Sequence, residues 1–301
     1  MLRRWNRSLL GATALVVSAY NQSTAQGASW APVEQALGRT AVPQASDVMR
    51  FNFPRRDLHV TVGDVQVKPS LALGSWVAFK RMPDGNAMAM GDLVLTEAEI
   101  NPVISLLQQG GVEQTAVHNH LIGASPNTMY VHIRAHGKEL DIARAIRHAL
   151  EASKTPLDTA PTAPAAAFDL DTTALAKALG YSGKVNGGVY QVGVGRADKV
   201  TEDGMDIPGS MGLSTAINFQ PTGSGKAAIT GDFVMIASEV NSVIRALRDA
   251  GIQVTALHSH MIGETPHLYF MHFWANDDAI KLARGLAVAV SKTNAVKPTV
   301  H

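Results

Sequence analysis

Hydrophobic and polar residues follow the same order of patterns in both halves of the chain. Short stretches rich in Val, Ile, Phe and Thr, bounded by turn residues, predict strands at 57–62, 75–80, 87–95, 112–121 and 128–135 in the first half and at 188–195, 213–219 and 227–236 in the second. Apolar residues at helical spacing predict helices at 30–37, 138–153, 171–179 and 277–292. Strands grouped around long helices, without strict βαβ alternation, favour an α+β fold with a mainly antiparallel sheet.

A further amphipathic helix is predicted in each half, ending at Gly111 in the first and at Gly251 in the second. In the first half its start is open between two positions. Pro102 fits a helix that begins at Asn101, because proline is tolerated in the first turn, whereas the apolar spacing favours a helix capped by Thr96.

The two halves are copies of each other. Residues 91–150 align with residues 231–290 without a gap, so that GDLVLTEAEINPVISLLQQGGVEQTAVHNHLIG matches GDFVMIASEVNSVIRALRDAGIQVTALHSHMIG. A repeat of this length indicates a duplicated domain and not a solenoid. We therefore predict two tandem homologous domains, each a mainly antiparallel sheet with amphipathic helices, at 30–153 and 168–292, with a linker rich in Pro, Ala and Thr at 154–167 and a tail at 293–301.

The composition narrows the class of protein. A chain of 301 residues that is 46% hydrophobic and 17% charged is typical of a folded protein with a sizeable core. Its formal net charge of +1, with Lys and Arg scattered along the chain, argues against a nucleic-acid partner. Because the sequence has no cysteine, disulfides, a lipid-anchor cysteine and a cysteine nucleophile are excluded.

The first 25 residues predict an export signal. Arg3, Arg4 and Arg7 precede the apolar run SLLGATALVVSA. This run is shorter than the roughly 20 apolar residues that a membrane helix needs. Small residues at 23 and 25 suit signal peptidase, so we expect cleavage after Ala25 and a periplasmic or secreted protein with no stable membrane span. A retained membrane anchor and a twin-arginine signal are the alternatives.

Histidines carry the strongest chemical signal. Each copy has an H-x-H pair and a third histidine beyond a proline, namely His118, His120 and His132 in the first copy and His258, His260 and His272 in the second. In a strand the two imidazoles of an H-x-H pair point to one face. A hairpin centred on Pro126 places His132 opposite His120, with Cβ atoms about 5 Å apart. The rings then converge, unless a one-residue slip turns His132 to the other face.

Three neutral imidazoles from two strands are a known way to hold zinc with an open fourth position. We therefore predict a divalent transition metal as the cofactor, with zinc favoured and copper, iron or manganese as alternatives. The sequence leaves open whether each copy holds its own ion or whether both copies pool their histidines at one shared cleft. It also leaves open a metal-free polar network between the halves.

Several residues near the second set of histidines have no counterpart in the first copy. Glu264 stands in the turn where the first copy has Ala124, and we predict it as a fourth ligand or as the base that activates metal-bound water. If the protein is an enzyme, the expected reaction is metal-dependent hydrolysis. Further candidates for ligands, or for groups that orient the histidines, are Asp92, Asp232, Glu239, His267 and Tyr269, of which the acidic residues are also typical of turns and helix N-termini.

Two rival interpretations need no metal. In one, the histidine face is a binding module, and Tyr269, Phe273 and Trp274 stack on a cell-wall glycan or another small ligand. In the other, the protein is a structural component of the cell envelope. In every interpretation the expected partner is a small molecule or an envelope component, and the sequence does not indicate the oligomeric state.

The repeated blocks also resemble a known family. GSWVAFKR, GDLVLTEAEINPVISLLQQGGVEQTAVHNHLIGASP and MYVHIRAHG are similar to the LppY/LpqO lipoprotein family, a domain of unknown function, over residues 30–153 and 168–292. The resemblance implies an exported, envelope-associated protein and brings no established activity. The chain departs from the founding lipoproteins because it has no cysteine for lipidation, so a soluble periplasmic form is expected.

Overall fold

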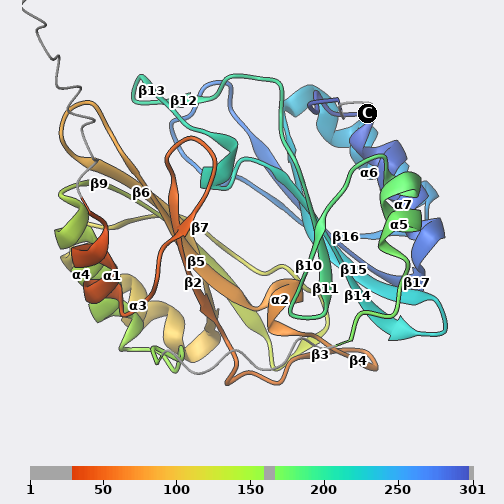
Figure 1. Cartoon of the computed structure of the whole chain (residues 1–301), viewed down its shortest axis with the longest axis horizontal. Coiled ribbons are helices and arrows are strands. Elements are labelled where there is room, and N and C mark those ends of the chain that lie inside the picture. Colours follow the sequence, from red (N-terminus) through yellow and green to blue (C-terminus); the bar gives the residue numbers. More distant parts are fainter. Residues whose placement is uncertain (1–28, 159–166, 298–301) are drawn as a thin grey trace, which may run out of the picture.

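The structure is a computed structural model that describes residues 29–158 and 167–297 of the chain. Each copy of the repeat forms a six-stranded antiparallel sheet with helices on one face (Figure 1). The predicted α+β fold with two tandem repeats is therefore confirmed. The predicted signal peptide and the central part of the linker lie outside the described residues.

The sheet of the first repeat has the strand order β1-β2-β5-β6-β9-β7. Its strands are β1 (Val42–Pro43), β2 (Met49–Pro54), β5 (Gly74–Arg81), β6 (Ala87–Thr96), β7 (Glu113–His118) and β9 (Thr128–Gly137). The longer helices are α1 (Ala31–Leu37), α3 (Glu97–Gln109) and α4 (Glu139–Leu150). A small separate sheet consists of β3 (Thr61–Val62), β4 (Val65–Gln66) and β8 (Ala124–Ser125), and helix α2 (Pro69–Ala72) follows β4.

The second repeat has the equivalent strand order β10-β11-β14-β15-β17-β16. Its strands are β10 (Lys184–Asn186), β11 (Val189–Val194), β14 (Thr215–Gly223), β15 (Lys226–Met235), β16 (Gln253–His258) and β17 (Tyr269–Asp278). The helices are α5 (Thr172–Leu179), α6 (Ala237–Asp249) and α7 (Ala279–Val290). A hairpin of β12 (Thr201–Glu202) and β13 (Met205–Asp206) precedes the 3₁₀ turn η1 (Gly209–Met211).

Where elements differ from the prediction, the cause is local hydrogen bonding. Helix α3 starts at Glu97, as the apolar spacing predicts, because the Thr96 N–H donates to the Glu99 side chain at 2.8 Å and closes a capping box. The predicted strand at 57–62 is wrong except for its last two residues. The backbone turns there instead, since the N–H of Leu58 donates to the carbonyl of Arg55.

The two sheets face each other through the surfaces that their helices leave free. Figure 1 shows α1, α3 and α4 of the first repeat on one side of the molecule and α5, α6 and α7 of the second repeat on the other, with both sheets between them. Buried apolar side chains from both repeats share two clusters at this seam, one that includes Met88, Met90, Val234 and Phe270 and one that includes Val94, Tyr130 and Trp274. The seam is therefore a hydrophobic core in its own right.

The segment from β3 to α2 ties the first repeat to the second. The Gln220 side chain in β14 accepts a hydrogen bond from the Lys68 N–H and donates one to the carbonyl of Gln66, both at 2.8 Å. On the other side of the seam, Arg134 of β9 forms ion pairs with Glu202 and Asp203 of the second repeat. Because polar links flank the apolar seam on both sides, each repeat holds the other in one orientation.

No helix among residues 29–158 and 167–297 is both long enough and apolar enough to cross a membrane.

Candidate functional site

The six repeated histidines meet at the seam between the two sheets. We call His118, His120, His132, His258, His260 and His272 the histidine cluster. Rings from different repeats stack in three pairs, with centroid separations of 3.5 Å for His118 and His258, 3.6 Å for His120 and His272, and 3.6 Å for His132 and His260. The two copies therefore pool their histidines at one shared site, which was one of the two arrangements that the sequence left open.

Strand pairing places a carboxylate beside the third histidine of each copy. In the first repeat Asp92 of β6 lies directly opposite His132 of β9, and in the second repeat Asp232 of β15 lies opposite His272 of β17. Directly opposed side chains share one face of a sheet, with Cβ atoms about 5 Å apart. The repeated Gly-Asp pair of the sequence thus supplies one aspartate to each half of the cluster.

The predicted register of the hairpin is wrong, although the predicted placement of His118 and His132 on one face of the sheet holds. His132 lies opposite Ala116, and His118 lies opposite Tyr130, so no pairing joins His120 to His132. The predicted strand at 112–121 ends at His118, which leaves His120 in the loop that follows. Because the register differs by an even number of residues, His132 still faces the same side as His118.

The loop histidines are held by aromatic rings and by the opposite repeat. The ring of His120 stacks on Tyr130 at 3.3 Å, and the ring of His260 stacks on Phe270 at 3.4 Å. The hydroxyl of Thr255 donates to the carbonyl of His120, and the hydroxyl of Thr115 donates to the carbonyl of His260. Each H-x-H loop is therefore positioned by the other copy of the repeat.

Backbone carbonyls define the tautomers of several rings. The Nδ1 atom of His272 lies 2.9 Å from the carbonyl oxygen of Gly231, and the Nδ1 atom of His258 lies 3.2 Å from that of Ser259. His118 makes the same contact with Asn119 at 3.2 Å. Since a carbonyl only accepts hydrogen bonds, each Nδ1 carries the proton, and each neutral ring presents a lone pair at Nε2. Metal-binding histidines are commonly oriented in this way.

Several polar atoms at the centre of the cluster lack hydrogen-bond partners. Within residues 29–158 and 167–297, the buried Nε2 atoms of His118, His120, His132 and His260 have no hydrogen-bond partner, and neither does Oδ1 of Asp92 or Asp232. The Nε2 atoms of His258 and His272 lie 2.9 Å apart with both Nδ1 protons directed at carbonyls. Buried polar atoms without partners are costly, and bound cations would satisfy them.

Burial also sets the protonation of the cluster. It lowers the pKa of His258 to about 4 and, with a further contribution from the charge of His258, that of His118 to about 3. The pKa values of the other four histidines lie well below 6.5, chiefly through burial and then through neighbouring histidines. Burial raises the pKa of Asp92 to about 7 against the opposing charge of Arg50. It raises that of Asp232 well above 3.8, with Asp92 adding to the effect. The imidazoles are thus neutral, as metal ligands must be.

The donor atoms form four overlapping sets in which all ligand atoms lie within 4.8 Å of one another. These sets are His118–His132–His258–His260, His118–His120–His272, Asp92–His120–His132 and Asp232–His260–His272. Imidazole nitrogens with a carboxylate oxygen suit zinc, copper, iron, nickel or manganese better than calcium or magnesium. The residues present therefore fit a divalent transition metal.

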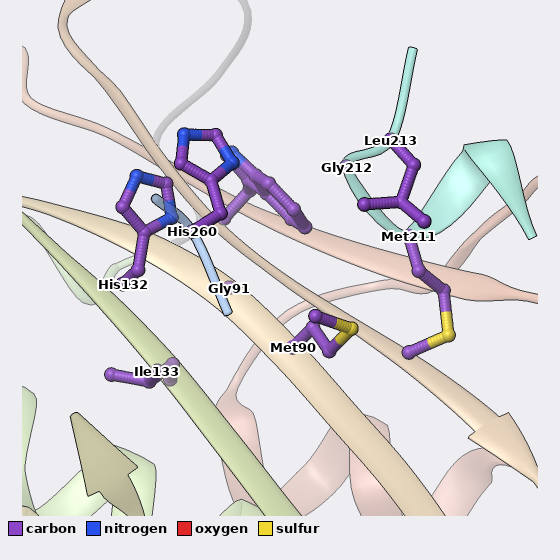
Figure 2. Close-up of a pocket in the computed structure, with 9 residues that line it drawn as sticks. Met90, Gly91, His132, Ile133, Met211, Gly212, Leu213 and His260 are labelled. Atoms are coloured by element: carbon purple, nitrogen blue, oxygen red, sulfur yellow. The ribbon is translucent and has the colours of Figure 1, made fainter. Parts of the chain in front are cut away.

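A small cavity adjoins the cluster. Figure 2 shows His132 and His260 side by side at this cavity, with Met90, Met211 and Leu213 beyond them. Its volume of about 10 Å³ is room for about one water molecule. Apolar side chains and backbone form the rest of the wall.

Glycine is required at Gly91 and Gly231, the residues before the two aspartates. A Cβ atom at Gly91 would lie 2.5 Å from the carbonyl oxygen of Trp76 in the neighbouring strand, and one at Gly231 would lie 1.9 Å from that of Ala216. Only a residue without a side chain permits this approach of the strands. The close approach explains why both copies have glycine before the aspartate.

The remaining predicted site residues lie outside the four donor sets. Glu264 is buried in the loop between β16 and β17, where its Oε1 accepts the Leu268 N–H at 2.8 Å and lies 3.0 Å from Nδ1 of His267. The exposed ring of His267 lies with Nε2 3.3 Å from the hydroxyl of Ser259 and edge-on to Tyr269 at 5.0 Å. Glu264, His267 and Ser259 thus form a chain of polar contacts from a buried carboxylate toward the surface.

Glu239 has a different environment. Its carboxylate pairs with the buried Arg196 and accepts the N–H groups of Ile236 and Asn294. It therefore caps helix α6, and the structure does not bring it to the histidines.

Comparison with known proteins places the duplicated segments in one family. Residues 31–152 and 173–292 match, one after the other, the model of a family described as Domain of Unknown Function (DUF1259). No curated protein matches the chain.

Among solved structures, the trimeric bacterial microcompartment shell protein PduB is 14% identical, with 85% of this chain and 95% of that chain covered and a TM-score of 0.22. EtuB from Clostridium kluyveri is 11% identical, with 83% and 90% covered and a TM-score of 0.20. Similarities this distant carry no information about function.

Proposed function

The chain belongs to the family of the Domain of Unknown Function (DUF1259), and from its site we propose that the protein binds a divalent transition metal in the histidine cluster. The description of the family names no activity. The observation that carries this proposal is the convergence of neutral, buried imidazole nitrogens that have no hydrogen-bond partner. Zinc is the favoured ion, because histidine nitrogens and aspartate oxygens are its usual ligands at about 2.0–2.2 Å. Copper, iron and manganese accept the same donors.

The chain's own residues would prepare the site for such an ion. The carbonyls of Asn119 and Ser259 orient the rings of His118 and His258, and the aromatic ring of Phe270 keeps His260 in place. Because these contacts exist among protein atoms, little reorganisation is needed on binding, which favours affinity. A bound divalent ion supplies Lewis acidity and lowers the pKa of a water molecule that it holds.

A metal-dependent hydrolase is the more specific proposal, with Glu264 as the general base. In support of it, Oε2 of Glu264 has no hydrogen-bond partner within the described residues, while Oε1 lies beside His267. His267 is exposed and stands between Glu264 and Ser259, so a proton taken up by the carboxylate has a path to solvent. The first copy lacks this carboxylate, since Ala124 occupies the equivalent position.

We further propose that the protein is exported and acts in the periplasm or outside the cell. The basic and apolar segments of the first 25 residues support export, and the resemblance to the LppY/LpqO lipoproteins supports an envelope location. The competing function is a metal-free module that binds a glycan or another envelope component. The buried imidazole nitrogens without hydrogen-bond partners favour metal binding over this alternative, because a sugar would have to reach buried atoms.

The test is the metal content of untagged protein, measured by mass spectrometry of the elements. We expect near-stoichiometric transition metal in the unmodified protein and loss of nearly all of it in the double variant His258→Ala/His260→Ala, which removes two ligands from overlapping sets. His267→Ala and Glu264→Gln alter the neighbouring loop outside these sets and serve as matched controls that keep the metal. Metal-free protein, or equal losses in His260→Ala and His267→Ala, would overturn the proposed ligands.

A further inference from the structure

We infer that the cluster is a two-metal centre, in which each repeat contributes one carboxylate and two imidazoles to its own ion. This inference rests on the proposed function and adds the number and arrangement of the ions. Its basis is a pair of donor sets that share no residue, Asp92–His120–His132 and Asp232–His260–His272. The duplication of the chain relates one set to the other.

Distances within each set suit the coordination of one ion. In the first set Nε2 of His120 and Nε2 of His132 lie 3.8 Å and 3.9 Å from the carboxylate oxygens of Asp92. In the second set Nε2 of His260 lies 3.3 Å from Asp232. Two ligands bound at about 2.0–2.1 Å to the same ion lie about 3–4 Å from each other. The contacts are too long to be strong hydrogen bonds, and they match this separation.

Ring stacking separates the two sets. His120 stacks on His272 and His132 stacks on His260, each with centroids 3.6 Å apart and planes within 27° of parallel. An imidazole directs its lone pair within the plane of the ring, so stacked rings direct their lone pairs along two separate planes. An ion that lies in the plane of one ring is therefore well out of the plane of its stacked partner, whereas two ions at a similar separation can each lie in the planes of their own ligands. Metal pairs in two-metal sites lie about 3.5–4 Å apart.

The central pair completes the coordination. His118 and His258 stack at 3.5 Å between the two sets, and each belongs to a donor set that crosses the seam. Six imidazoles and two carboxylates then provide four protein ligands for each of two ions, which is a usual number for zinc. Two divalent ions exceed the charge of two carboxylates by two units, so the centre takes an anionic oxygen ligand, such as hydroxide or a phosphate or carboxylate group.

The two positions are not equivalent. In the first set all three donor atoms are without hydrogen-bond partners, whereas in the second set the His272 nitrogen nearest to Asp232 is Nδ1, which donates to the carbonyl of Gly231. Occupying the second position requires His272 to break this bond or to turn its ring. The first position therefore fills first.

Zinc titration of the chelator-treated full chain tests this arrangement. After dialysis we expect two zinc ions per chain for the unmodified protein, one for Asp92→Asn and one for Asp232→Asn, because each substitution removes the only carboxylate of one set. Asp84→Asn, which removes the exposed carboxylate paired with His136 outside the cluster, is the matched control and should retain both ions.

A spectroscopic measurement on the unmodified protein makes the test independent of how the variants fold. One equivalent of Cu²⁺ should give an isolated-ion electron paramagnetic resonance signal, and a second equivalent should broaden it and add a half-field transition, because the two spins lie about 4 Å apart. A single ion per chain, with no spin coupling, would overturn the two-metal centre and leave the proposed metal binding intact. Absence of any bound metal would overturn both.

Discussion

Stripping the metal from the protein is expected to lower its thermal unfolding midpoint by about 10 °C. A ligand that binds only the native state, present at about 1,000 times its dissociation constant, stabilises that state by about 4 kcal/mol. For a protein of this size each kcal/mol shifts the midpoint by about 2–4 °C. The metal ligands lie far apart in sequence and meet only in the folded chain. Calorimetry of protein with and without a strong chelator measures the shift.

The double variant His258→Ala/His260→Ala provides the control for this measurement. Without its ligands it should unfold at the same temperature in the presence and absence of chelator, and added zinc should restore the midpoint only in the unmodified protein. An unmodified protein that is indifferent to the chelator would argue for a cluster held by hydrogen bonds and stacking alone.

Gly231→Ala is expected to destabilise the second repeat by about 3 kcal/mol and to remove metal from its half of the cluster. The added methyl group would lie 1.9 Å from the carbonyl oxygen of Ala216 and within 3.0 Å of the Phe273 ring, so β14 and β15 must separate. Overpacking of a core costs about 1–3 kcal/mol, and a clash with rigid backbone lies at the upper end of that range. The separation displaces Asp232, the next residue, from His272. Urea unfolding and metal analysis of the same preparation report the two effects.

Gly193→Ala is the matched control, because Gly193 also lies in a strand of the second sheet and a Cβ atom there would meet nothing within 4 Å. It should keep its metal and stay close to the stability of the unmodified protein. If Gly231→Ala and Gly193→Ala behaved alike, the close approach of the strands would not be what places Asp232 in the cluster.

The pooled site changes how the duplication is understood. Each repeat alone presents its histidines on the face of a sheet that its own helices do not cover, where they would meet water. The second repeat supplies the opposing wall, the stacked rings and the hydroxyl groups that hold the H-x-H loops. A buried site with paired donors therefore requires both copies, which gives a physical reason for a chain with two.

Local patterns in the sequence were sufficient to predict the parts of the site. The alternation of side chains along a strand puts His118 and His132 on one face whatever even register the hairpin adopts, so their proximity survived a wrong register. The repeated Gly-Asp and H-x-H pairs marked Asp92, Asp232 and the histidines, because a pattern kept in two diverged copies reflects a shared requirement. Apolar spacing also favoured the helix start at Thr96, whereas Pro102 left a start at Asn101 open, and the capping box in the structure decides between them.

The assembly of those parts was beyond the reach of such patterns. That His120 stacks against His272 of the other copy, and that Thr115 holds the loop of His260, depends on how two apolar sheet faces pack, and no residue spacing within one copy encodes that packing. The same holds for Glu264, whose bond to Leu268 and contact with His267 come from the course of a loop. Periodicity decides which face of a strand is polar, whereas the burial of apolar surface between the repeats decides what that face meets.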